Sequence, residues 1–121
     1  MEWTIQFDAA AERLVVTVTG TRTAAPLKEM TRQLRDALLE HPTRQVLLDY
    51  TRTRSGLEPY EIFERPKILQ ELNFPADVRV AVLYETLDEN TQFLENVYRN
   101  RNFSVRVFAD RPQALAWLGE G

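Results

Sequence analysis

The sequence contains no cysteine and only one histidine, His41, among its 121 residues. The lack of cysteine excludes a disulfide framework, a thiol nucleophile and a zinc site of the Cys₄ or Cys₂His₂ kind. A Ser/His/Asp triad could use only His41. We expect His41 at the C-terminus of a helix, where an imidazole meets free carbonyl groups, and assign it no catalytic or metal role. These absences predict a protein without a metal or cofactor and favour binding over catalysis.

Long apolar runs, a signal sequence and a surplus of basic residues are also missing. No apolar run approaches the ~20 residues that a membrane-spanning helix needs. Residues 1–5 lack the basic and hydrophobic segments of a signal peptide. Acidic residues outnumber Lys and Arg by 18 to 15, which gives a net charge of −3, so general nucleic-acid binding is not expected. The sequence therefore predicts a cytoplasmic protein with no transmembrane segment.

The length and composition predict one folded domain over residues 1–121. Apolar residues make up 44% of the chain and charged residues 27%, close to the averages for globular proteins. A chain of this size buries roughly two-thirds of the surface that its unfolded state exposes. It shows no internal repeat, linker or low-complexity segment, so we divide it no further.

The predicted strands share an alternating or a continuously apolar pattern and lie at 3–7, 14–19, 46–50, 78–84 and 105–108. The first two are joined by a short connection, which predicts an N-terminal antiparallel hairpin. The run at 46–50 is short and almost continuously apolar, which is typical of a central strand covered on both faces.

Apolar residues three or four positions apart predict helices after the hairpin and between the later strands. These helices lie at 25–40, at about 57–72, after the capping-box pattern at 86–89, and from Asp110 onward. The order β-β-α-β-α-β-α-β-α predicts an α/β fold with a mixed, mostly parallel sheet of about five strands and about four helices. Pro66 predicts a kink or break near Arg65.

The C-terminal end carries the most specific pattern in the sequence. Asn-Arg-Asn-Phe-Ser-Val-Arg-Val-Phe at 100–108 precedes Asp110 and Ala-Leu-Ala-Trp-Leu at 114–118. This segment resembles a set of bacterial SpoIIAA-like proteins, of the STAS/anti-sigma-factor-antagonist superfamily, that show an Asn-Arg-Gly turn, a Val-Arg-Val-Phe strand and an Ala-Leu-Ala-Trp-Leu helix. Asn102 stands where Gly is usual and tolerates the same positive φ. The order of elements resembles that family too, and its fold resembles Sec14-type lipid-binding domains.

The resemblance implies a regulatory role through a protein partner. STAS antagonists regulate a kinase partner through a phosphorylatable Ser in the motif Asp-Ser-Ser-Gly-Leu, at the start of the helix after the central strand. Ser55, Gly56 and Leu57 are similar to the end of that motif, whereas Thr53 and Arg54 replace its first two residues. The resemblance thus makes Ser55 the candidate for a phosphoswitch.

Residues 51–57 are predicted to form a polar loop at the carboxyl end of a central strand, leading into a helix. Open α/β sheets place ligands at this edge, and a helix N-terminus favours anions. Arg52, Arg54, Ser55 and Gly56 are therefore candidates for binding an anionic small molecule or a lipid head group. The alternative is a plain polar loop in which Ser55 caps the helix.

Three further carboxylates and a tyrosine are predicted near the same edge of the sheet. Asp49, Tyr84, Glu85 and Asp110 each end or follow a predicted strand, and their convergence in one crevice would support an enzyme. The carboxylates at 58, 61 and 64 have helical spacing but no nearby histidine, which indicates a solvated helix face.

The function predicted from the sequence is a non-enzymatic binding or regulatory domain acting through a protein partner. Binding of an anionic small molecule or lipid head group at residues 51–57 is the alternative, and an enzyme comes third. The sequence leaves homodimer contacts through the remaining apolar helix faces open.

Overall fold

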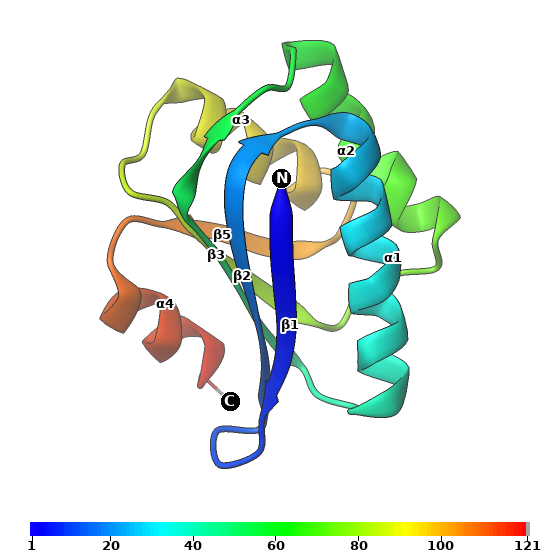
Figure 1. Ribbon diagram of the computed structural model, residues 1–121, viewed down its shortest axis with the longest axis vertical. Helices are drawn as coiled ribbons and strands as arrows, with labels where there is room; N and C mark the ends of the chain where they lie inside the picture. Colours follow the sequence, from blue (N-terminus) through cyan, green and yellow to red (C-terminus); the bar gives the residue numbers. More distant parts are fainter. Residues whose placement is uncertain (121) are drawn as a thin grey trace.

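The computed structural model describes residues 1–120, and within them the helices and strands follow the predicted order (Figure 1). In chain order they are β1 (Glu2–Asp8), β2 (Arg13–Arg22), α1 (Ala24–Glu40), β3 (Gln45–Ser55), α2 (Pro59–Glu71), β4 (Arg79–Leu83), α3 (Glu89–Arg99), β5 (Ser104–Phe108) and α4 (Arg111–Leu118). No helix in this part of the chain is both long and apolar enough to cross a membrane.

The strands form one mixed sheet in the order β1-β2-β3-β4-β5. β1 and β2 are the predicted antiparallel hairpin, and every later neighbour is parallel. Val46 of β3 pairs with Leu14 of β2 on one side and with Val80 of β4 on the other. The prediction of a mixed, mostly parallel sheet with a hairpin at its start is confirmed.

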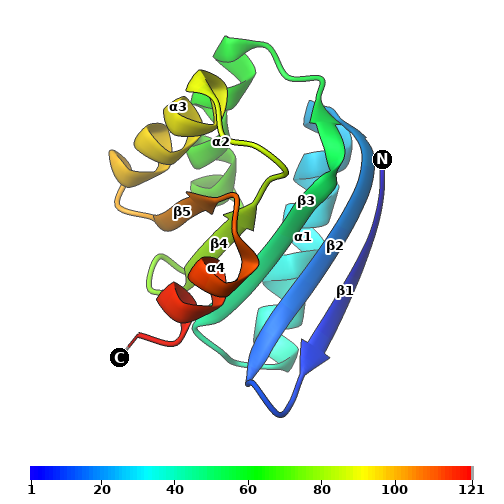
Figure 2. The same cartoon turned by 90° about the vertical axis from the view of Figure 1, so that its left-hand side faces the viewer.

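Helices cover the two faces of the sheet unequally (Figure 2). α1, α2 and α3 bury apolar side chains on one face, together with Val16, Leu48 and Val82 of the central strands. α4 alone packs on the other face, where Ala114 and Leu118 meet residues of β3, β4 and β5. The larger first layer is the one that contains the cavities described below.

The first helix illustrates how spacing places side chains. Leu27, Met30, Leu34 and Leu38 lie three or four residues apart and are all buried against the sheet. His41 follows the last turn, as predicted: its N–H donates to the Ala37 carbonyl at 2.8 Å, and its ring stacks on Phe7 with centroids 4.6 Å apart. The histidine therefore has a structural place at the helix end.

The predicted cap of α3 and the predicted break at Pro66 are wrong. The cap of α3 is Asp88, whose side chain accepts from the Thr91 N–H at 2.9 Å while the Thr91 hydroxyl accepts from the Asp88 N–H at 2.9 Å. This reciprocal pair satisfies the first turn two residues later than the predicted Thr86 box. Pro66 does not break α2, which runs from Pro59 to Glu71; its ring is fully buried, and that packing offsets the missing hydrogen bond.

Two other predictions about helix ends are confirmed. Asn102 adopts φ 65° just after α3, in the left-handed region that asparagine tolerates. The Asp110 carboxylate accepts from the Gln113 N–H at 3.1 Å and so caps α4.

The predicted polar loop at 51–56 is mostly strand, because β3 continues to Ser55 alongside β2, which continues to Arg22. Thr19 pairs with Arg52, and Arg22 pairs with Ser55, beyond a register shift in β2. Each polar segment supplies the backbone hydrogen-bond partners of the other. Arg54 adds a cross-strand hydrogen bond to the Thr21 hydroxyl at 3.3 Å. Two segments that each look like loops in isolation therefore form a parallel ladder together.

Candidate functional site

Residues 51–55 belong to the extended β3, and Gly56 and Leu57 connect it to Glu58, the residue that precedes the first turn of α2. α2 begins only at Pro59, and the Glu61 side chain accepts from the Glu58 N–H at 3.0 Å. Proline in the first turn and this side-chain contact fix the helix start. Ser55 is therefore no helix cap; its hydroxyl accepts from the Leu57 N–H at 3.2 Å and is otherwise exposed.

Gly56 lies where the ends of β2 and β3 come closest. Its N–H donates to the Arg22 carbonyl at 2.8 Å. A Cβ at this position would lie 2.8 Å from the Thr21 methyl carbon and 2.9 Å from the Arg22 carbonyl oxygen. The requirement for glycine is thus explained by backbone packing.

A cavity of about 260 Å³ opens at the carboxyl ends of β3 and β4; we call it the outer cavity. It brings together Arg54, Ser55, Tyr84 and Glu85 from the predicted set, and adds Arg22. Arg52 and Gly56 lie outside it. Asp88 joins Glu85 in its lining, so carboxylates offset the arginine charges there.

Asp49 does not join this cavity, which corrects the predicted crevice. Its carboxylate faces α4, where it accepts from the Arg111 guanidinium at 2.6 Å and from the Thr51 hydroxyl at 2.6 Å. Tyr84 lies on the opposite face of the sheet, edge-on to Tyr50. Neighbouring residues of a strand point to opposite faces of the sheet. Asp49 therefore faces α4, while Tyr50, the next residue, faces the cavity. Asp110 caps α4 instead.

The environment of Asp49 favours its charged form. Burial alone would raise the pKa of this carboxyl group. The hydrogen bonds from Thr51 and the charge of Arg111 outweigh burial and lower its pKa. Asp49 is therefore a paired, ionised carboxylate with a structural role.

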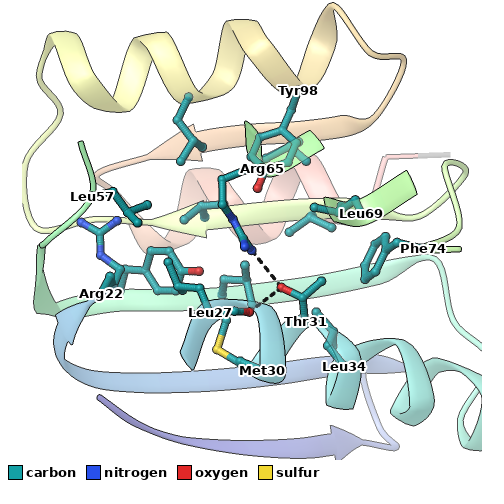
Figure 3. Close-up of a pocket in the computed structure, with 16 residues that line it drawn as sticks. Arg22, Leu27, Met30, Thr31, Leu34, Leu57, Arg65, Leu69, Phe74 and Tyr98 are labelled. Carbon is teal, nitrogen blue, oxygen red and sulfur yellow. Dashed lines mark hydrogen bonds between the residues drawn. The ribbon is translucent and has the colours of Figure 1, made fainter. Parts of the chain in front are cut away.

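A second cavity of about 50 Å³ lies deeper, between the sheet and α1, α2 and α3; we call it the inner cavity (Figure 3). Its lining is apolar apart from two arginines, Arg22 and Arg65, one threonine and two tyrosines. Arg22, Tyr50 and Leu57 are among the residues that line both cavities. The two cavities thus adjoin at the end of β3.

Arg22 forms part of the boundary between the cavities and is only 7% exposed. Its Nε donates to the Thr53 hydroxyl at 3.0 Å. Its guanidinium carbon lies 4.9 Å from the ring centroid of Tyr50 and 5.1 Å from that of Tyr84. Two aromatic faces therefore stabilise this buried cation.

Arg65 enters the inner cavity from α2 and is only 5% exposed (Figure 3). Its Nη2 donates to the Thr31 hydroxyl at 2.9 Å, and that hydroxyl itself donates to the Leu27 carbonyl. Its Nη1 and the Tyr84 hydroxyl are buried without a hydrogen-bond partner within residues 1–120.

Three tyrosines surround these cations. Burial raises the pKa of Tyr50 to about 12, and Arg65 and Arg22 oppose that rise. Burial likewise raises the pKa of Tyr84, and Arg22 opposes it. Tyr98 is close enough to influence both groups. The Tyr50 and Tyr84 hydroxyls therefore remain protonated donors at neutral pH.

Sequence reasoning missed both buried arginines. Arg22 fell in a segment interpreted as a loop, and Arg65 was considered only as the residue before Pro66. A signal for Arg65 was present, because it lies three residues after Ile62 and four before Leu69, on the buried face of α2.

Large apolar side chains are exposed on α2 and α3 and on the segment between β4 and α3. These residues, which we call the apolar patch, are Tyr60 (69% exposed), Phe63 (55%), Leu87 (48%) and Phe93 (37%). Glu58, just before α2, and Glu64, on α2, are exposed, and Glu61 is half-buried. Residues 1–120 contain no group of three or more potential metal ligands.

Comparisons with known proteins agree on the fold. The sequence profile of the SpoIIAA-like family matches residues 13–119, and no curated protein matches the chain. An uncharacterized protein with a SpoIIAA-like fold from Shewanella loihica PV-4 is 20% identical, with a TM-score of 0.62 over 97% of this chain and 92% of its own. The unphosphorylated anti-sigma factor antagonist SpoIIAA is 9% identical, with a TM-score of 0.53 over 99% of both chains. The chain belongs to the SpoIIAA-like family.

Proposed function

We propose that this protein is a non-enzymatic regulatory domain that binds a protein partner through the apolar patch. The observation that carries the proposal is the exposure of Tyr60 and Phe63 on one helix, at 69% and 55%. Exposed aromatic side chains of this size mark interaction surfaces more often than chance would place them there. SpoIIAA, whose fold this chain shares, is an anti-sigma factor antagonist and therefore acts on another protein.

The charge around the apolar patch defines the partner's chemistry. Glu61 and Glu64 lie on the same helix as Tyr60 and Phe63, and Glu58 directly precedes it. Glu85 and Glu89 are exposed before and at the start of α3. A partner segment with apolar side chains flanked by Lys or Arg would complement this surface. An anionic membrane would be repelled by the same carboxylates, so the acidic rim favours a protein.

Ser55 is the proposed place of regulation. Its hydroxyl is exposed at the end of β3 and lines the outer cavity beside Arg54. A phosphate there would add close to two negative charges next to Glu85 and Asp88, which line the same cavity. Phosphorylation of Ser55 would thus change the charge of the cavity mouth.

Binding of an anion at residues 51–57 has less support from the geometry. Arg52 lies outside the outer cavity, and Gly56 is required by the packing of two strands. Arg54 and Ser55 do line the cavity, but they share it with two carboxylates. The charge balance therefore argues against this loop as the main anion site.

The partner can be tested with paired variants. Tyr60→Glu/Phe63→Glu disrupts the apolar patch, and Leu39→Glu is the matched control because Leu39 is 77% exposed on α1, outside the apolar patch. Cross-linking in native lysate identifies proteins that bind the wild type and Leu39→Glu but not the double variant. Such a protein is then purified. We expect its dissociation constant to rise about tenfold in the double variant and to rise between about 50 and 500 mM salt.

Three results would overturn the proposal. The purified partner could bind the double variant as well as the wild type. The wild type could bind vesicles of anionic phospholipid and no protein. A homodimer abolished by Tyr60→Glu/Phe63→Glu in sedimentation would mean that a second copy covers the apolar patch.

A further inference from the structure

We propose that the inner cavity is a binding site for the charged group of a small organic anion, a carboxylate or a phosphate, held by Arg65 with Arg22 at the edge of the cavity. The site differs from the apolar patch, which lies on the exposed surface, and it adjoins residues 51–57, because Leu57 is one of its lining residues. Arg65 points from α2 into the cavity toward Thr31, and Arg22, at the end of β2, lies at its edge beside Leu57 (Figure 3).

Neither buried arginine has a carboxylate partner. The ion pairs formed within residues 1–120 involve other arginines, and none of the inner-cavity lining residues is acidic. Glu95 is buried, but its carboxylate accepts from the Val107 N–H at 2.9 Å and from Arg99 at 3.4 Å. The inner cavity therefore holds the charge of Arg65 without a counter-charge among its lining residues, whereas Arg22 also lines the outer cavity, which contains Glu85 and Asp88.

Such an arrangement is costly without a ligand. A buried charge that lacks an opposite charge loses its hydration without full compensation. Tyrosine rings and the Thr53 hydroxyl support Arg22. Arg65 has a single described partner, Thr31, and its Nη1 has none. An anion would supply the missing acceptor through charge-assisted hydrogen bonds.

The donors around the cavity match an oxyanion. A guanidinium group presents its N–H donors as a planar fork suited to carboxylate and phosphate oxygens. The Tyr84 hydroxyl is a further buried donor without a partner, and it lies beside Arg22. Its raised pKa keeps that proton in place at neutral pH. Arg65 thus offers unused positive charge and a free donor within the inner cavity, and Tyr84 offers a further donor from the outer cavity, beside Arg22.

The volumes of the cavities limit the size of the ligand. A water-sized group needs roughly 10–15 Å³ of such space, so the inner cavity of about 50 Å³ holds only a few heavy atoms. The outer cavity of about 260 Å³ adjoins it at Arg22, Tyr50 and Leu57. We therefore place the charged group inside and the body of the ligand in the outer cavity, beside Thr53 and Ser55.

Matched probes test the proposal by calorimetry on the full chain. Benzoate and phenyl phosphate carry the charge on one ring, benzamide is neutral, and benzylamine is cationic. We expect benzoate or phenyl phosphate to bind, and benzamide and benzylamine to bind at least about tenfold more weakly. Acetate and inorganic phosphate show whether the anion alone is sufficient.

Substitutions locate the site. Arg65→Met retains much of the side-chain volume without the charge, and Arg52→Met removes an exposed arginine of β3 that lies outside both cavities. We expect Arg65→Met to weaken anion binding about tenfold or more while the unliganded protein becomes equally or more resistant to urea, because an unpaired buried charge is removed. Arg52→Met should bind as the wild type does. Arg22→Met provides a second test of binding.

Several outcomes would overturn the proposal. Equal binding of benzoate and benzamide would show a cavity that recognises the ring alone. Equal affinity of Arg65→Met and wild type would place the anion elsewhere. Failure of all anionic probes to bind, together with a strong loss of stability in Arg65→Met, would mean that Arg65 is a structural residue. None of these results bears on the protein partner, which is tested at the apolar patch.

Discussion

The guanidinium carbon of Arg22 lies 4.9 Å from the ring centroid of Tyr50, so the last residue of β2 is held against the side chain that ends the apolar part of β3. The same guanidinium donates from Nε to the Thr53 hydroxyl at 3.0 Å. These contacts join the two long polar strand ends that form one wall of the cavities. The arrangement depends on a planar cation that can stack and donate at once.

The first prediction concerns this cation. Arg22→Lys should lower the free energy of unfolding by about 1–2 kcal/mol, because an ammonium group cannot stack on the tyrosine ring and donate to Thr53 in the same way. Urea unfolding followed by circular dichroism measures the change. Arg52→Lys is the control, since Arg52 is exposed, and should stay within about 0.5 kcal/mol of wild type. Equal stability of both variants would contradict the role given to Arg22.

The second prediction concerns the close approach at Gly56. Gly56→Ala should destabilise the protein by about 1–3 kcal/mol, because overpacking forces neighbouring atoms to shift. The new Cβ would meet the Arg22 carbonyl oxygen at 2.9 Å, and backbone cannot easily yield. Gly119→Ala is the matched control, since its nearest atom is 3.6 Å away. Thermal unfolding of the two variants should differ clearly, and similar midpoints would refute the packing argument.

The third prediction concerns alkaline pH. The pKa of Tyr50 is raised to about 12 in the folded protein, whereas an unfolded tyrosine ionises near pH 10. Above about pH 10 the unfolded state binds fewer protons, so stability falls with pH by about 1.4 kcal/mol per pH unit for each such tyrosine. Below about pH 10 both states are protonated and this dependence vanishes. The raised pKa of Tyr84 adds to the slope.

Urea unfolding between about pH 9 and the raised pKa of Tyr50, about 12, measures this slope. Tyr84→Phe should make the slope shallower, because one of the two buried hydroxyls no longer ionises on unfolding. Tyr60→Phe is the control, since the Tyr60 side chain is 69% exposed. If Tyr60→Phe reduces the slope as much as Tyr84→Phe does, then burial of Tyr50 and Tyr84 is not the cause of the slope.

Sequence patterns predicted the elements whose signals are long and local. The spacing of Leu27, Met30, Leu34 and Leu38 is enough to define α1. Continuous apolar runs define the centres of β3 and β4, and apolar alternation defines β5. The hairpin and the parallel order follow from the alternation of these elements. The fold was therefore predictable because each element carries its own pattern.

The candidate site was harder to predict because it depends on pairs of distant segments. β3 continues past Tyr50 only because the polar end of β2 offers backbone partners, and neither segment is apolar enough to indicate a strand alone. Burial of Arg22 follows from that pairing. Asp49 and Tyr84 lie on opposite faces of the sheet, and a shift of one residue along a strand would reverse the face to which a side chain points. Helical spacing places Arg65 on the buried face of α2, but Pro66 predicted a break in the helix at that point.

The fourth prediction concerns Asp49, whose carboxylate accepts from Arg111 at 2.6 Å. Its pKa is lowered on folding, so the pair stabilises the protein above the unfolded pKa of about 3.9 and loses that contribution as pH falls through the folded value. Asp49→Asn should cost about 1 kcal/mol at neutral pH, a modest value because the Arg111 side chain is 49% exposed.

The difference between Asp49→Asn and wild type should therefore shrink as pH falls below about 4, where the carboxyl group binds a proton in the unfolded state while folding still lowers its pKa. Asp77→Asn is the control, because Asp77 and Arg44 form an ion pair at 3.6 Å with side chains 65% and 80% exposed, and exposed pairs contribute little. Urea unfolding across the acid range measures both variants. A loss in Asp49→Asn that is constant with pH would show that the hydrogen bonds of Asp49, and not its charge, stabilise the contact between β3 and α4.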